Sequence, residues 1–142
     1  MPKPSPIPEQ LSPQMRQRLR DLRDRLLKLH KALLDDERIA YERVHGRVTG
    51  GEMLQLVISH EWFAWLHPVS ELVVQVDEML DGDEPAIWGD AQMLLAHARI
   101  LLMPSETGQA FSKKYYSAIQ REPAVVLAHA EVRRVLAQEP NP

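Results

Sequence analysis

A leucine repeat near the start of the chain constrains the fold more than any other feature. Apolar residues recur there at alternating spacings of four and three, at Met15, Leu19, Leu22, Leu26, Leu29 and Leu33. This spacing places them on one face of an α-helix, in a heptad pattern. Ser12 and Pro13 fit an N-cap and a first helical residue, and Gly46 fits a C-terminal stop. The sequence therefore predicts a helix from residue 12 to about Val44 or His45.

A second helix is predicted from Thr49 through Leu80. Thr49 is followed three residues later by Glu52, which is the spacing of a capping box. One apolar face is again spaced by threes and fours, at Leu54, Ile58, Trp62, Trp65, Val69, Leu72, Val76 and Met79. Phe63 belongs to a second apolar face of the same helix. Pro68 lacks an amide hydrogen and crowds the preceding turn, so we expect a kink there.

Two further helices are predicted in the second half of the chain. The sequence DGDEP at residues 81–85 should end the second helix. A third helix is expected over residues 85–103 and a fourth from residue 105 or 107 to about residue 138. Pro123 should break the fourth helix, because the residue before a proline disfavours helical backbone.

We therefore expect an all-α, four-helix bundle in which helices 1 and 2 form a long antiparallel hairpin. The chain has 142 residues, which is near the commonest size of a single domain. One helical domain is predicted over residues 12–138. Prolines at even positions make residues 1–11 a flexible Pro-rich arm, and residues 139–142 are expected to be a frayed tail.

Charge is distributed unevenly along the chain. Residues 1–47 contain eleven Lys and Arg against seven Asp and Glu, whereas residues 48–98 contain no Lys or Arg and nine acidic residues. The basic first third can pair with the acidic middle third within one chain, or between copies of the chain. The formal net charge of −3 and the lack of aromatic residues among the arginines do not favour a nucleic acid as partner.

An interaction surface is predicted from the basic first helix and the aromatic part of the second. Its candidate residues are Arg16, Arg20, Arg23, Trp62, Phe63 and Trp65. The first helix is long, and shorter third and fourth helices would leave some of the first hairpin uncovered. Uncovered apolar surface predicts a homodimer or higher oligomer through the first two helices, or a protein partner bound there.

The six histidines raise an alternative, because bundle metal and haem sites use side chains from facing helices. The candidate ligands are His67, Glu71, His97 and His129, for iron or haem. His67 and Glu71 are four residues apart and share a helix face. The ligand pattern of hemerythrins is incomplete here, however, since Leu101 stands four residues after His97 and Arg134 five residues after His129. Ferritin-like proteins need two Glu-x-x-His motifs, and the chain has one.

Signatures of catalysis are weak. The chain has no cysteine, which excludes disulfides, thiolate zinc sites and a cysteine nucleophile. It also has no Gly-rich phosphate loop, nucleophile elbow or His-Glu-x-x-His motif. Residues 1–13 contain five prolines and lack the apolar stretch of a signal peptide. No apolar stretch without charges is long enough to span a membrane. We therefore predict a non-enzymatic, cytoplasmic bundle that acts by self-association or by binding a partner protein.

Overall fold

The computed structural model describes residues 10–82 and 84–138, and this part of the chain is all helical apart from one backbone bridge between Gln10 and Ile87. The predicted all-α class is confirmed. The number of helices is not four, because the described residues form six α-helices and one 3₁₀ segment. These are α1 (Pro13–His45), α2 (Gly50–Ser59), η1 (Glu61–Leu66), α3 (His67–Asp81), α4 (Trp88–Leu101), α5 (Ala110–Arg121) and α6 (Pro123–Leu136). None of them is long and apolar enough to cross a membrane.

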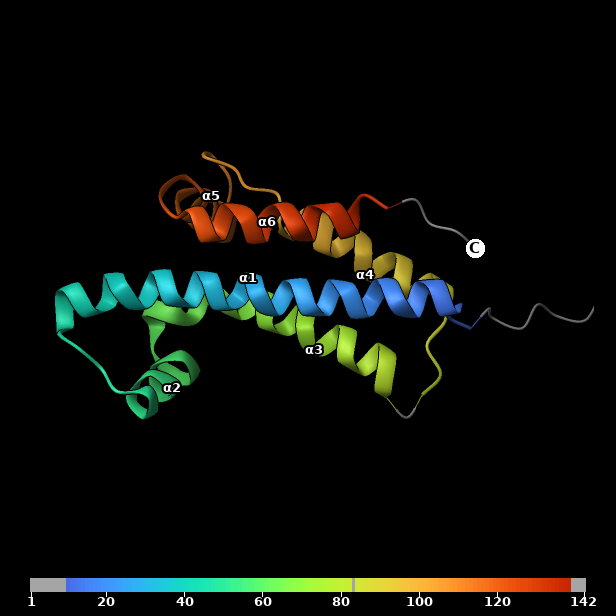
Figure 1. Cartoon of the computed structure of the whole chain (residues 1–142), viewed down its shortest axis with the longest axis horizontal. Helices are drawn as coiled ribbons and strands as arrows, with labels where there is room; N and C mark the ends of the chain where they lie inside the picture. The colour runs from blue at the N-terminus through green and yellow to red at the C-terminus, as the bar shows by residue number, and fades with distance from the viewer. Residues whose placement is uncertain (1–9, 83, 139–142) are drawn as a thin grey trace, which may run out of the picture.

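Helix α1 is the central helix of the fold. Its 33 residues span about 50 Å. It begins where predicted, since the Ser12 hydroxyl accepts the Met15 amide at 3.1 Å, and it ends at Gly46 with φ 86°. α6 runs along one side of α1 and α3 along the other, both antiparallel to it (Figure 1). The six apolar residues of the heptad face are all buried between these helices.

The predicted second helix is wrong as a single helix, because it is interrupted at His60. This residue has extended backbone angles, φ −90° and ψ 136°, and its Nδ1 accepts the Trp62 amide at 3.0 Å. Three segments result, α2, η1 and α3. Pro68 causes no kink in a continuous helix, because it lies in the first turn of α3. Its missing amide hydrogen would have no helical partner there in any case.

The 3₁₀ segment changes which residues enter the core. A 3₁₀ helix has three residues per turn, so residues three apart share one face. Phe63 and Leu66 of this segment are accordingly fully buried. Leu54 and Ile58, which the continuous helix placed on the core face, are instead exposed, at 59% and 61% of their surface.

The second half of the chain follows the prediction more closely. α4 starts at Trp88 rather than at residue 85, because Ile87 is extended and pairs with Gln10. α5 starts at Ala110, a few residues later than predicted. The break near Pro123 is confirmed: Glu122 is extended between α5 and α6, and its side chain accepts the Ala124 amide at 3.2 Å.

Most of the predicted arm, residues 1–9, and the predicted tail, residues 139–142, lie outside the described residues. Of the remaining two positions of the arm, Gln10 makes the bridge to Ile87 and Leu11 is buried against the core.

Candidate functional site

The four predicted metal ligands are on three different helices. His67 and Glu71 are exposed on α3, His97 is exposed on α4, and His129 is half-buried on α6. His67 donates from Nε2 to the carbonyl oxygen of Val57 at 3.3 Å. Nowhere in residues 10–82 and 84–138 do three or more His, Asp or Glu side chains form a group that could hold a metal ion. The iron or haem alternative stays a prediction, without support from this geometry.

His129 has a specific role in packing α6 against α5. Its Nδ1 lies 2.6 Å from the hydroxyl oxygen of Tyr115, which is fully buried. Burial raises the pKa of the Tyr115 hydroxyl, so the tyrosine keeps its proton. Burial, and secondarily the positive charge of Arg133, lowers the pKa of His129. The tyrosine therefore donates to a neutral imidazole, and this pair joins α5 to α6.

Acid should destabilise the fold through two histidines. Burial lowers the pKa of His129, and burial together with His67 lowers that of His30. An unfolded histidine has a pKa near about 6.5, so below that pH the unfolded chain binds protons that the folded chain does not. The free energy of unfolding should therefore fall as the pH drops from about 7 to about 5.5. Urea unfolding at both pH values measures this.

The variants that test this pH effect are His129→Gln and His30→Gln. Each should reduce the difference in stability between the two pH values. An unaltered difference in His129→Gln would show that other groups cause the acid sensitivity.

The predicted arginines mostly bind within the chain. Arg23 pairs with Asp77 of α3 at 3.0 Å, and Arg16 donates to the carbonyl oxygen of Leu80 at 3.3 Å. Arg20 is exposed, and among the described residues it donates to Gln17 alone, at 3.4 Å. The basic first third and the acidic middle third thus meet inside one molecule, along the contact between α1 and α3.

The predicted aromatic residues also pack internally. Phe63 is fully buried in the core and has no accessible surface for a partner. Trp62 is half-buried with its ring 5.5 Å from that of Tyr41, and Trp65 is half-buried with its ring 5.7 Å from that of Phe111. The indole rings of both tryptophans connect the 3₁₀ segment to α1 and α5.

Two arginines that sequence analysis did not single out converge on the C-terminus of α6. Arg18 of α1 is buried and donates to the carbonyl oxygens of Val135, Leu136 and Gln138, at 3.3, 3.2 and 2.7 Å. Arg99 of α4 donates twice to Leu136, at 3.0 and 2.7 Å. Cations are favourable at the C-terminus of a helix, which is the negative end of its dipole. These hydrogen bonds therefore stabilise the contact of α1 and α4 with the end of α6.

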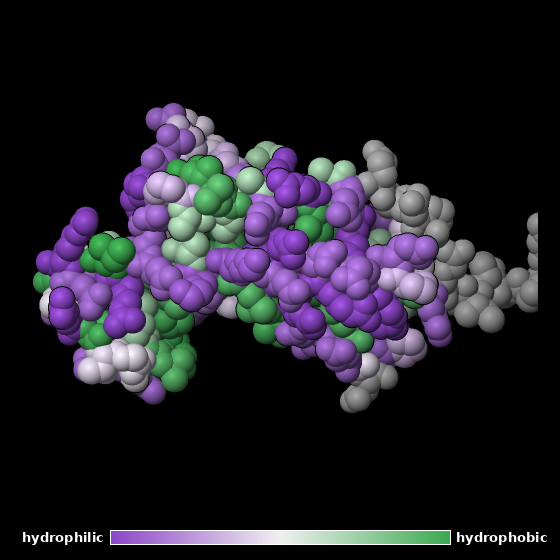
Figure 2. Space-filling model, in the orientation of Figure 1, coloured by the Kyte–Doolittle hydropathy of each residue, from purple (hydrophilic) through white to green (hydrophobic). Residues whose placement is uncertain are grey.

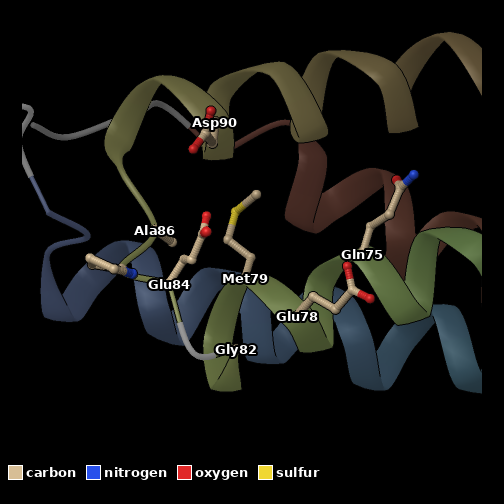
Figure 3. A pocket seen from close by; sticks show the side chains of 8 residues that line it. Gln75, Glu78, Met79, Gly82, Glu84, Ala86 and Asp90 are labelled. Atoms are coloured by element: carbon tan, nitrogen blue, oxygen red, sulfur yellow. The ribbon is translucent and has the colours of Figure 1, made fainter.

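An open hollow of about 590 Å³ lies between the end of α3 and the start of α4. Figure 3 shows the Met79 side chain between the carboxylates of Glu84 and Glu78. Among the described residues, its lining includes the three acidic side chains of Glu78, Glu84 and Asp90 and no basic one. The lining residues are Gln75, Glu78, Met79, Gly82, Glu84, Pro85, Ala86 and Asp90.

Helix α2 presents apolar side chains to solvent at one end of the molecule. Hydrophobic surface is visible at this end of the molecule (Figure 2). Leu54 and Ile58 of α2 and Val44 at the end of α1 are exposed. Glu52 is the one charged residue of α2. In Figure 1 this helix projects from the body of the molecule beside η1.

Helix α4 carries a longer apolar surface. Its inner side is buried in the core through Ala91, Leu94, Leu95 and Ala98. Its outer side is exposed and also apolar, and we call this surface the outer face of α4. It consists of Gly89, Met93, Ala96, Ile100 and, just beyond the helix end, Met103. Of their surface, Met93 exposes 74%, Ile100 73% and Met103 57%.

No known protein family, curated protein or solved structure matches this chain. Function therefore has to be inferred from the surfaces above. Some of the ionisable side chains that lie close together join helices, as Arg23 and Asp77 do, whereas the outer face of α4 and the apolar side chains of α2 are exposed.

Proposed function

We propose that the protein is a non-enzymatic assembly module that works by self-association. The observation that carries this proposal is the outer face of α4, where Met93 and Ile100 expose almost three quarters of their surface. Monomeric soluble proteins rarely expose contiguous large apolar side chains, and such patches mark interaction sites. A helix that is apolar on both faces favours a buried environment, which a second molecule can provide.

The roles of the polar groups support a binding function over catalysis. The close ionisable pairs hold the helices in place: Arg23 with Asp77 joins α1 to α3, and Tyr115 with His129 joins α5 to α6. The outer face of α4, in contrast, exposes large apolar side chains. The apolar surface on α2 is a second area through which such a module could bind a protein.

Light scattering on a sizing column, at concentrations from about 1 to several hundred micromolar, tests the proposal. We expect the average mass to rise with concentration above the 16.3 kDa of one chain. Met93→Lys and Ile100→Lys should each weaken association at least about tenfold, because burying a large apolar side chain contributes more than 1.4 kcal/mol.

Both substitutions are at exposed positions, so the thermal unfolding midpoint should stay within a few degrees of the parent. Leu54→Lys on α2 is the matched control, since it adds the same charge on a different apolar surface. A mass of 16.3 kDa at every concentration would contradict self-association.

A further inference from the structure

The outer face of α4 has the spacing of a heptad repeat. Its five residues follow one another at intervals of four, three, four and three. This is the pattern by which two helices pack side by side, with each residue fitting between residues of the facing helix. α4 therefore carries two apolar faces, and in the part of the chain that the structure describes only the inner one is covered.

Small and large residues alternate along the outer face from Gly89 to Ile100. Met93 and Ile100 are large and seven residues apart, and Gly89 and Ala96 are small and also seven residues apart. A side chain added at Gly89 would meet no atom within 4 Å, and the backbone there does not have the positive φ that favours glycine. Nothing in the described chain therefore requires a glycine at a position where alanine would strengthen the helix. The space at Gly89 is available to an atom from outside the chain.

An antiparallel copy of α4 fits this pattern. α4 spans Trp88–Leu101, and a twofold axis at its midpoint relates each residue to a position in the second copy. This relation sets Gly89 opposite Ile100 of the second copy and Met93 opposite Ala96 of the second copy. Met93 and Ile100, the two large residues of this face within the helix, then each face a small residue, so this part of the face is complementary to itself.

Charge along the edge of the face agrees with the same arrangement. Asp90 and His97 are both exposed and lie on one edge of the outer face, seven residues apart. Neither has a hydrogen-bond or ion-pair partner among residues 10–82 and 84–138. In an antiparallel pair this edge meets itself, which brings Asp90 beside His97 of the second copy, twice by symmetry. In a parallel pair the edge would instead meet Gln92 and Arg99, and Arg99 already binds Leu136.

We propose that the outer face of α4 pairs antiparallel with the outer face of α4 in a second copy of this chain. This inference rests on the proposed self-association and specifies its surface and geometry. The helix is about 21 Å long, so the shared area is small and the dimer is expected to be weak and dependent on concentration.

Single cysteines test the geometry cleanly, because the chain has none of its own. In the antiparallel pair, two copies of residue 89 are separated by about 16 Å along the helix, and so are two copies of residue 100. A disulfide needs Cα atoms within about 7 Å. Gly89→Cys and Ile100→Cys should therefore form no dimer when oxidised separately, and a disulfide-linked dimer when mixed.

The alternative outcomes are distinct. A linked dimer in each variant alone would indicate a parallel pair and overturn the inference. Association of the parent protein without a linked dimer in the mixture would overturn the α4 pairing while leaving self-association intact. A parent protein that stays monomeric would overturn both, and would leave the outer face of α4 to a different protein.

A second variant keeps the test independent of cysteine chemistry. Gly89→Leu fills the space that Ile100 of the second copy occupies, so association should weaken at least about tenfold, although a Cβ at residue 89 meets no atom of the folded monomer within 4 Å. Gly51→Leu is the matched control, since a Cβ at residue 51 also meets no atom within 4 Å and this residue lies on α2. Equal association constants for Gly89→Leu and the parent would contradict the pairing.

Discussion

Replacing Phe63 by alanine is expected to lower the free energy of unfolding by about 3–5 kcal/mol. The ring is fully buried at the junction of η1 with α1, and its centroid lies 5.6 Å from that of Tyr41. Truncation removes this apolar surface from the core and leaves a cavity, because the neighbouring helices can collapse only in part. Urea unfolding with linear extrapolation measures the difference.

Leu54→Ala is the matched control for Phe63→Ala. Both substitutions truncate a large apolar side chain in the segment before α3, but Leu54 exposes 59% of its surface. Its cost should stay below about 1 kcal/mol. If Phe63→Ala leaves no folded protein, Phe63→Leu gives the same comparison at a smaller cost. A larger loss of unfolding free energy for Leu54→Ala than for the Phe63 variants would contradict this interrupted arrangement. It would support the continuous helix that the heptad spacing predicts.

Phe63 shows where periodicity misleads. The spacing from Leu54 through Trp62 to Val69 suits one continuous α-helix, and that assumption places Trp62 and Trp65 on the core face. Because the chain is interrupted at His60, the side chains that precede α3 point in other directions than one continuous helix would give them. A spacing of three, from Phe63 through Leu66 to Val69, was the available signal for a 3₁₀ turn. Short apolar runs do not reveal their own period, so only tertiary packing decides between the two.

The sequence correctly predicted those helix ends that depend on a few neighbouring residues. The cap at Ser12, the stop at Gly46 and the break before Pro123 each depend on one or two residues, and each is present in the structure. The number of helices depends instead on how segments pack, and the expected four became six. A heptad pattern likewise does not show whether a face is covered within the chain. The heptad face of α1 is buried, whereas that of α4, from Gly89 to Met103, is exposed.

The candidate sites were less predictable than the fold. Six histidines spread over the predicted helices suggested a shared centre, but composition does not say which faces meet. The partner of His129 is Tyr115, fourteen residues away on the preceding helix. The sequence does not distinguish the buried Arg18 from the arginines around it, because Arg16, Arg18 and Arg20 alternate in one basic run. Only the position of the α6 C-terminus distinguishes Arg18 from its neighbours.

Replacing Arg18 by methionine is expected to lower the free energy of unfolding by about 2–3 kcal/mol. Methionine keeps an apolar stem but donates no hydrogen bond, so the Gln138 carbonyl loses its 2.7 Å contact. The end of α6 also loses a cation, worth about 0.5–1 kcal/mol at a helix C-terminus. Relief from burying the guanidinium offsets part of this cost. Arg20→Met, at the exposed position two residues later, should change stability by less than about 0.5 kcal/mol.

A double-mutant cycle separates the hydrogen bonds of Arg18 from its packing. Arg18 and Arg99 both donate to the Leu136 carbonyl, so either single substitution leaves that oxygen one charged donor. Removing both arginines leaves it none, and a buried carbonyl without a partner costs about 1–3 kcal/mol. The double variant should therefore lose about 1 kcal/mol more than the sum of the two single losses. Additive losses would mean that each arginine contributes through its own packing and that the shared carbonyl does not couple α1 to α4.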